Sequence, residues 1–199
     1  MLVCPAEHTI QNILEADQQC LVSFDVVFDG PIGPSFVAEL PRPISIGMRD
    51  ADPSLVQVMT LIANEMQVSR CGKTLFFNHA GNILLISLMR HLTSCPQQES
   101  GLFLALSDPR IARSLIAMHA KPSHPWTLET LANLAGMSRT SFANYFKDVM
   151  QVPPGKYLEN LRLAIARQLV QTGVGLKQIA ARTGYASPST LSRALARSV

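Results

Sequence analysis

The chain has 199 residues, of which 47% are hydrophobic and 16% are charged, so it can bury a core and does not have the composition of a disordered chain. Its formal net charge is +3, but residues 1–105 contain 5 basic and 10 acidic side chains, whereas residues 106–199 contain 12 basic and 4 acidic ones. This asymmetry predicts that only the C-terminal half meets a polyanion.

The sequence indicates a cytoplasmic protein that does not span a membrane. The cysteines, Cys4, Cys20, Cys71 and Cys95, form no Cys-x-x-Cys pair, and we expect reduced, mostly buried thiols. The N-terminus has neither a basic region nor a long apolar run, so no signal peptide is expected. The longest strongly apolar run, 83–89, is far too short for a membrane span.

Residues 1–50 are expected to contribute a short β segment. Apolar and polar side chains alternate over residues 20–28, which predicts a strand, and the turn residues of 29–34 end it. A second extended segment is expected over residues 40–48. Because one or two strands do not make a stable sheet, this segment must pack on helices or form the end of a barrel.

Residues 51–100 are predicted to form a helical hairpin followed by a linker. Asp52 and Pro53 are typical of a helix start, as N-cap and first helical residue. A second helix is expected over about 74–92, and residues 93–101 are expected to be the linker. The apolar residues expected to face inward are Leu55, Val58, Met59, Ile62 and Met66 in the first helix and Leu84, Leu85, Leu88 and Leu92 in the second.

Residues 106–199 are predicted to form an all-α domain. Asp108 and Pro109 are expected to begin its first helix, and a helix capped by Thr127 follows. A long helix is expected over 156–172, and it would span about 25 Å. It would therefore hold the helices before it and the helices after it well apart. The fold class is therefore mainly α, with a helical hairpin and a short residual β segment before the C-terminal domain.

This domain contains the same short pattern twice. Residues 131–138 combine a helix end, Gly136 and the capping Ser138, and residues 179–187 repeat this with Gly184 and Ser187. Each copy predicts a helix, a glycine turn and a second helix. This is the helix-turn-helix pattern, whose second helix can enter a DNA major groove.

Residues 108–199 resemble the DNA-binding domain of the AraC family of bacterial transcription regulators. The matching residues are Trp126-Thr127-Leu128-Glu129-x-Leu131-Ala132, Ala135-Gly136-Met137-Ser138, Phe142, Phe146-Lys147, Pro153-x-x-x-Tyr157-Leu158, Arg162-x-x-x-Ala166, Ile179-Ala180, Gly184-Tyr185 and Ser192-Arg193-Ala194. The preceding segment, with Phe28-Asp29-Gly30-Pro31, looks like family members whose sensor is a cupin-like barrel, of which residues 1–50 would supply the last part.

This chain departs from the family pattern at several positions. The family usually has Arg at the position of Asn144, Gly at that of Gln151, and Phe at those of Leu191 and Leu195. Ala196 stands where Lys or Arg is common, and the chain ends at Val199, before the position of a closing helix that family members carry.

The predicted DNA-contacting residues lie on the second helix of each copy. In the first copy they are Arg139, Thr140, Ala143, Asn144 and Lys147, and in the second they are Ser189, Thr190, Arg193 and Arg197. The resemblance implies that Thr140, Ala143 and Asn144 face bases, and Arg193 is the best single candidate for a guanine contact. For Arg139, Lys147 and Arg197 a phosphate contact or plain solvent exposure is favoured over base reading.

The sequence predicts no catalytic residue, metal site or cofactor. The histidines, His8, His79, His91, His119 and His124, are scattered without a ligand partner at metal-binding spacing, and exposed histidines are the favoured interpretation of His119 and His124. Nucleotide-binding glycine loops and nucleophile motifs are not found. The chain is therefore not expected to be an enzyme.

Two functions remain open at this point. The first is a sequence-specific transcription regulator that binds double-stranded DNA, with a homodimer through residues 54–92 and a small-molecule effector in a full-length form as further partners. The second is a truncated interaction module that dimerises with a full-length relative without productive DNA binding. A steep dependence of DNA affinity on salt would separate them.

Overall fold

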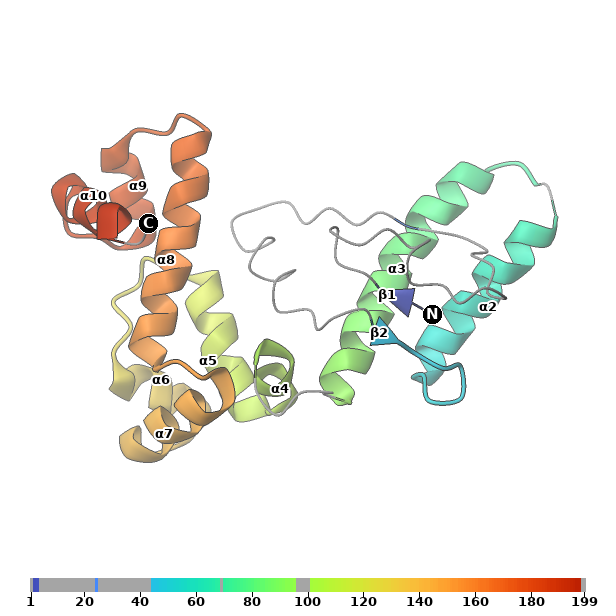
Figure 1. Cartoon of the computed structure of the whole chain (residues 1–199), viewed down its shortest axis with the longest axis horizontal. Coiled ribbons are helices and arrows are strands. Elements are labelled where there is room, and N and C mark those ends of the chain that lie inside the picture. The colour runs from blue at the N-terminus through green and yellow to red at the C-terminus, as the bar shows by residue number, and fades with distance from the viewer. Residues whose placement is uncertain (1, 4–23, 25–43, 69, 96–100, 198–199) are drawn as a thin grey trace. The chain divides into compact units, whose positions relative to one another are not determined.

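The computed structural model describes residues 2–3, 24, 44–68, 70–95 and 101–197, and the chain divides into two compact units (Figure 1). The described residues up to 95 belong to the first unit, and residues 101–197 belong to the second. As predicted, the described part of the chain is mainly helical. Its elements are β1 (Leu2–Val3), β2 (Ile44–Ser45), α2 (Pro53–Gln67), α3 (Lys73–Ser94), α4 (Leu102–Ser107), α5 (Pro109–Ala120), α6 (Leu128–Ala135), α7 (Arg139–Met150), α8 (Pro154–Gln171), α9 (Leu176–Thr183) and α10 (Pro188–Arg197).

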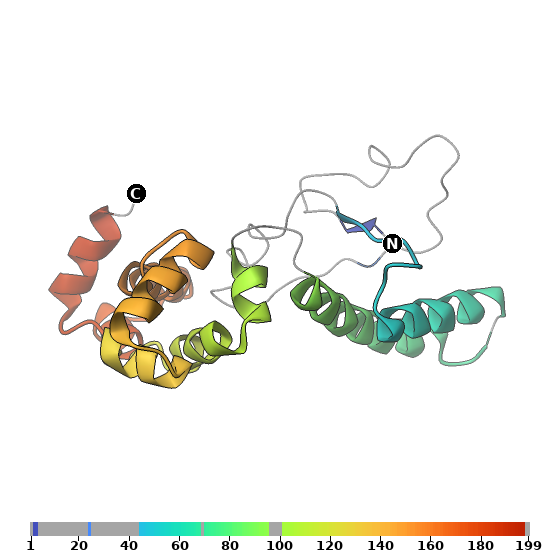
Figure 2. The same cartoon turned by 90° about the horizontal axis from the view of Figure 1, so that it is seen from below.

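The first unit contains the predicted helical hairpin. Helix α2 begins where expected, because the Asp52 carboxylate accepts a hydrogen bond from the Ser54 backbone N–H at 2.8 Å and Pro53 opens the helix. Helices α2 and α3 lie side by side and antiparallel in both views (Figures 1 and 2). The buried apolar residues between them and along their inner faces are Leu55, Val58, Ile62, Ala80, Leu88 and Leu92.

Short extended segments accompany the hairpin. Strands β1 and β2 pair antiparallel, and β2 lies within the extended segment expected over 40–48. The predicted strand 20–28 lies outside the described residues except for Phe24, whose ring packs near Phe77 with 6.4 Å between centroids. A Cβ on Gly81 would lie 2.9 Å from Cδ1 of Phe24, so this glycine of α3 allows the close approach of the ring.

The second unit begins with α4, a helix that sequence analysis missed. Residues 102–107 are almost entirely apolar, so they show no helical periodicity, and no element is predicted between the linker and the helix that begins at Asp108 and Pro109. Leu102, Phe103 and Ala105 are buried, and the Gly101 N–H donates to the Val149 carbonyl at 2.7 Å. Helix α4 packs against α5 and α7, so the packed unit includes residues before position 106.

Helix α8 contributes to both cores of the second unit. Leu158 and Leu161, near its start, belong to the larger core, which is formed with α4, α5, α6 and α7. Ala166, farther along, belongs to a smaller core formed with Ile179 and Leu191 of α9 and α10. Figure 1 shows α8 running from α6 and α7 at one end to α9 and α10 at the other. This helix therefore carries the two halves of the unit.

Two expectations about thiols and histidines are corrected. Cys71 and Cys95 are exposed, because one lies in the turn between α2 and α3 and the other follows the end of α3; Cys4 and Cys20 lie outside the described residues. His119 is half-buried rather than exposed, because α5 turns it toward Tyr157, whose hydroxyl lies 2.7 Å from Nε2. His124 is exposed, as expected. Among the described residues, none of the helices has the length and apolar character needed to cross a membrane.

Candidate nucleic-acid interface

The second unit contains two helix-turn-helix motifs, named here the first motif (residues 128–150, α6 and α7) and the second motif (residues 176–197, α9 and α10). In each, a helix of 8 residues is followed by a left-handed glycine and a longer second helix. Gly136 has φ 67° and Gly184 has φ 74°, a region that favours glycine because it has no Cβ. The two glycine turns predicted from the sequence are confirmed.

The two turns use the same hydrogen bonds. After the first glycine, the Met137 N–H donates to the Ala132 carbonyl at 3.0 Å, and after the second the Tyr185 N–H donates to the Ala180 carbonyl at 2.9 Å. Each bond spans five residues, as in the Schellman motif that ends many helices. Ser138 then caps α7 by accepting from the Ser141 N–H at 3.2 Å. The two motifs are therefore built alike despite different side chains.

The apolar face of each second helix is buried. Phe142 and Phe146 of α7 are both 0% exposed, and their ring centroids lie 5.5 Å apart. Leu191 of α10 is also 0% exposed, and Leu195 is half-buried against the same core. Truncating a buried Phe to Ala costs about 3–5 kcal/mol, so these contacts hold the second helices firmly in place.

The predicted contact residues occupy the opposite faces. Seven of them are exposed: Arg139, Thr140, Asn144, Lys147, Ser189, Arg193 and Arg197. Ala143 and Thr190 are half-buried, so each presents only part of its side chain to a partner. The structure thus places one group of five on α7 and one group of four on α10, and contact with DNA remains a prediction for each residue.

A small hydroxyl cluster begins α10. The Ser187 Oγ accepts from the Thr190 N–H at 3.2 Å and lies 2.9 Å from both the Ser189 Oγ and the Thr190 Oγ1. Two of the predicted contact residues therefore also take part in the cap. The Arg193 Nε donates to the Ser189 carbonyl at 3.4 Å. Arg193 itself is exposed on α10. Hydrogen bonds therefore link the cap of α10 to three of the predicted contact residues, Ser189, Thr190 and Arg193.

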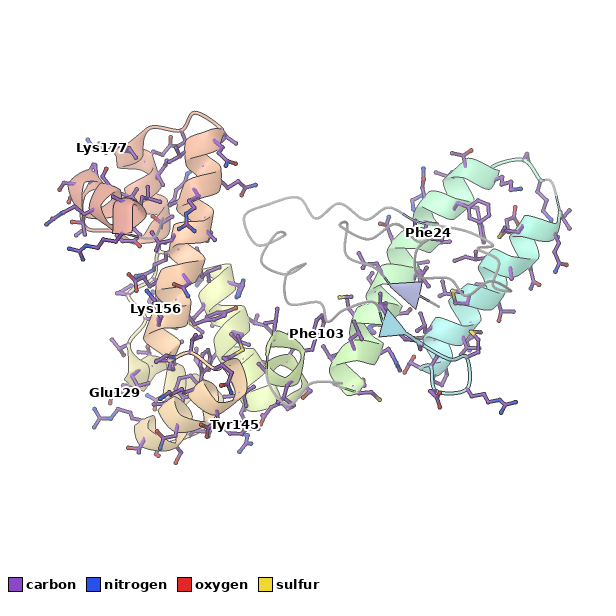
Figure 3. The ribbon with its side chains drawn as sticks, viewed as in Figure 1. Phe24, Phe103, Glu129, Tyr145, Lys156 and Lys177 are labelled. Carbon is purple, nitrogen blue, oxygen red and sulfur yellow. The ribbon has the colours of Figure 1, made fainter. Side chains whose placement is uncertain are left out.

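The charge of the two motifs differs sharply. The first motif holds two basic and two acidic residues, whereas the second holds four basic residues, Lys177, Arg182, Arg193 and Arg197, and no acidic one. Lys177 and Arg182 are exposed on α9 and were not among the predicted contact residues. Figure 3 shows Glu129 and Tyr145 at the first motif and Lys177 at the second. A count of charges in each motif, instead of in each half of the chain, would have identified Lys177 and Arg182 as candidates.

Tyr145 of α7 contacts an ion pair at the start of α5. Asp108 caps α5 and contacts the Arg110 guanidinium with 2.7 Å between Oδ2 and Nη2. The hydrogen bond from Arg110, together with one from the Tyr145 hydroxyl, holds the pKa of Asp108 well below its usual range. The guanidinium also lies over the Tyr145 ring at 5.2 Å. Tyr145 belongs to α7, so this contact helps to orient the helix that carries the first group of predicted contact residues.

The described residues bring together no cluster of three metal-binding side chains. Burial lowers the pKa of His119, so its imidazole is neutral at neutral pH and pairs with the Tyr157 hydroxyl rather than with a carboxylate. The exposed polar faces of α7 and α10 support binding as the role of this unit.

Fold and surface together define a protein with two helix-turn-helix motifs joined by a long helix. Residues 131–199 match the family model described as Helix-turn-helix domain, and residues 3–94 match the one described as Cupin. The chain is similar to AraC-like transcription regulators, as the resemblance of its motifs had indicated.

Curated relatives carry corresponding names. The chain is 34% identical over 174 residues to the HTH-type transcriptional regulator AlkR of Acinetobacter baylyi, and the matched region is 85% of this chain and 56% of AlkR. It is 36% identical over 141 residues to an AraC-like transcription regulator of Streptomyces antibioticus, which covers 70% of this chain and 46% of that protein. The chain therefore spans about half the length of these relatives.

A solved structure is also similar to part of the chain. It is the crystal structure of the DNA-binding domain of AdpA, described as the global transcriptional factor, in complex with a target DNA. The TM-score is 0.44 and the identity 28%, over 46% of this chain and 83% of that chain.

Proposed function

We propose that this chain is a sequence-specific DNA-binding transcription regulator that contacts two adjacent major-groove segments through α7 and α10. The observation that carries the proposal is the division of both helices into a buried apolar face and an exposed polar face, repeated in two motifs of one unit. The DNA-binding domain is proposed to comprise residues 106–199, with α4 packed on it, and residues 1–50 and 51–100 are proposed as the cupin-type β segment and the hairpin with its linker.

Binding rather than catalysis would provide the activity. Basic side chains neutralise phosphates and release counterions, which supplies affinity for any sequence. Asn144 can pair with adenine, Arg193 can donate two hydrogen bonds to guanine, and Thr140 can contact a thymine methyl group. Helix α8, with 18 residues, is about 27 Å long. This length is compatible with two motifs on one side of a duplex, where major-groove segments repeat about every 34 Å.

The proposal is tested with a duplex selected by the full chain from a random 40-bp pool. We expect the dissociation constant, measured by fluorescence anisotropy, to rise steeply as salt is increased. The Arg193→Ala variant should lose about 1–3 kcal/mol of discrimination at a single base pair, because only a base contact depends on sequence. The Lys156→Gln variant is the control, since Lys156 lies on α8 and already pairs with Glu159 at 3.0 Å. Absence of binding at low salt would refute the proposal.

A second candidate function is self-association through residues 54–92. Three large apolar side chains on α3, Leu75, Ile83 and Ile86, are 63%, 52% and 52% exposed. Their spacing of eight and three residues places them on one helix face. We propose a homodimer through this face, to be tested by sedimentation velocity of the full chain and of the Ile83→Lys, Ile86→Lys double variant. If DNA binding is absent while a dimer persists, the interaction-module function replaces the regulator.

A further inference from the structure

The loop between α5 and α6 is bound by a side chain of the long helix α8. The Arg162 Nε donates to the Pro122 carbonyl at 2.8 Å, and its Nη2 donates to the His124 carbonyl at 2.8 Å. The planar guanidinium presents its donors in a fixed fork, so it can hold two carbonyls at once in a set geometry. Residues 121–126 are named here the junction loop, and this contact joins them to a residue 38–40 positions away in the sequence.

The junction loop is also braced internally. The Trp126 Nε1 donates to the Lys121 carbonyl at 2.9 Å, and the His124 N–H donates to the same carbonyl at 3.1 Å. The His124 and Trp126 rings meet edge to face with 4.3 Å between centroids. Because Trp126 directly precedes Thr127, the N-cap of α6, a loop held in this way transmits its position to the first motif.

The turn of the second motif also lies against the junction loop, next to Arg162. A Cβ added to Gly184 would lie 2.8 Å from the Ser123 carbonyl oxygen, 3.0 Å from the Ser123 Cα and 3.1 Å from the Arg162 Nη2. A Cβ added to Gly136, the equivalent glycine of the first motif, would meet nothing within 4 Å. Both glycines have positive φ, but only Gly184 is also required by a close backbone contact.

We infer that Arg162 is a positioning residue, which fixes the placement of α10 relative to α7 and so sets the spacing of the two DNA half-sites; this rests on the proposed function. Gly173 and Gly175 lie between α8 and α9, and a connection with two glycines can bend. The smaller core holds the second motif on α8, and the junction adds a direct contact between the second motif and the loop that leads into the first motif. The contact of Gly184 with Ser123 limits the bending that Gly173 and Gly175 would otherwise allow.

The consequence for DNA is a strict preference for one half-site spacing. Inserting one base pair moves the second half-site by about 3.4 Å and rotates it by about 34° around the duplex. A rigid pair of motifs cannot follow both changes. A loosened pair can follow them, but it binds the best spacing less tightly because the effective concentration of the second motif falls.

The test uses the full chain, the duplex that it selects from the random pool, and versions with one base pair inserted or deleted between the half-sites. We expect the wild type to lose roughly tenfold or more in affinity on each change, and the Arg162→Gln variant to lose less than about threefold. Affinity for a duplex that carries a single half-site should be equal for both proteins. An unchanged spacing penalty in the variant overturns the inference.

A direct phosphate contact by Arg162 would give a different result. In that case Arg162→Gln would weaken binding to all duplexes alike, single half-sites included, and reduce the salt slope by about 1, which overturns the inference. If Arg162→Gln does not fold, Gly184→Ala and Gly136→Ala replace it as a matched pair. Both variants place a Cβ at positive φ, but only the Cβ at position 184 meets the junction loop. Only Gly184→Ala should therefore lose the spacing preference, and equal behaviour of the pair overturns the inference.

A measurement without DNA separates this inference from the proposed function. Spin labels on Asp148→Cys of α7 and Ala196→Cys of α10, both exposed positions, are introduced after the native cysteines are replaced by serine. The distribution of label distances should be narrow with Arg162 and clearly broader with Arg162→Gln. Equal widths overturn the inference whatever the DNA result, whereas absence of DNA binding together with a broadened distribution refutes only the proposed function.

Discussion

The backbone of Gln151, at the end of α7, is strained. It ends α7 with φ 58° and is the one non-glycine residue of positive φ among the described residues. An L-residue in this region costs about 1–2 kcal/mol, which the side chain offsets in part, because its Nε2 donates to the Asp148 carbonyl. Gln151→Gly should therefore stabilise the second unit by about 1 kcal/mol in urea unfolding. Gln151→Ala is the control and should destabilise it, since the strain remains and the hydrogen bond is lost.

Two tyrosine hydroxyls of the second unit are in opposite situations. The Tyr157 hydroxyl pairs with the His119 Nε2, whereas the Tyr185 hydroxyl is buried without a hydrogen-bond partner among the described residues, and burial raises the pKa of Tyr185. Tyr157→Phe should cost about 1 kcal/mol of unfolding free energy, whereas Tyr185→Phe should cost nothing or add up to about 1 kcal/mol. Thermal unfolding of both variants measures the difference, and an equal loss would contradict this account.

Local features of single residues were predictable from the sequence. The left-handed conformations of Gly136 and Gly184 and the caps at Asp52, Asp108 and Ser138 depend on residues a few positions apart, so a short window contains the whole cause. The junction of Arg162 with the loop at residues 121–126 was not predicted. It joins residues about 40 positions apart, and no local pattern indicates that an arginine will meet two backbone carbonyls.

At the scale of elements, the periodic helices were predictable and α4 was not. Helices α2, α5 and α8 have a polar start or a proline and an apolar stripe, which together define their limits. Helix α4 has neither, because its six residues are nearly all apolar and their burial depends on α5 and α7. Which of the predicted contact residues touch DNA also could not be decided, since a polar helix face looks the same whether it meets a groove or solvent.

The charge difference between the two motifs leads to a prediction for α9. The second motif has four basic residues and no acidic one, so a duplex that carries only its half-site should bind more tightly and with a steeper salt dependence than one that carries only the first half-site. Lys177→Gln together with Arg182→Gln should reduce that slope by up to about 2. Lys156→Gln is the matched control because of its pair with Glu159. An unchanged slope in the double variant would show that neither Lys177 nor Arg182 contacts phosphate.

At the scale of the whole molecule, the chain has separate cores in two compact units. Val58 and Ile62 of the first unit pack with Ala80, whereas Phe142 and Phe146 lie in the larger core of the second. Cooperative unfolding follows a shared core, so each unit should have its own transition. The family resemblance predicted a division into a sensor part and a DNA-binding part, but the stability of each part is a property of packing and needs measurement.

The single tryptophan makes this division measurable. Trp126 packs against the core of the second unit, so its fluorescence should report the unfolding of that unit alone, whereas far-ultraviolet circular dichroism follows the helices of both. We expect urea curves from the two probes that do not coincide. Ile62→Ala, at a fully buried position of α2, should cost about 2–5 kcal/mol and shift only the dichroism curve, whereas Leu115→Ala in α5 should shift both. Coincident curves that shift together in both variants would mean that the two units unfold as one.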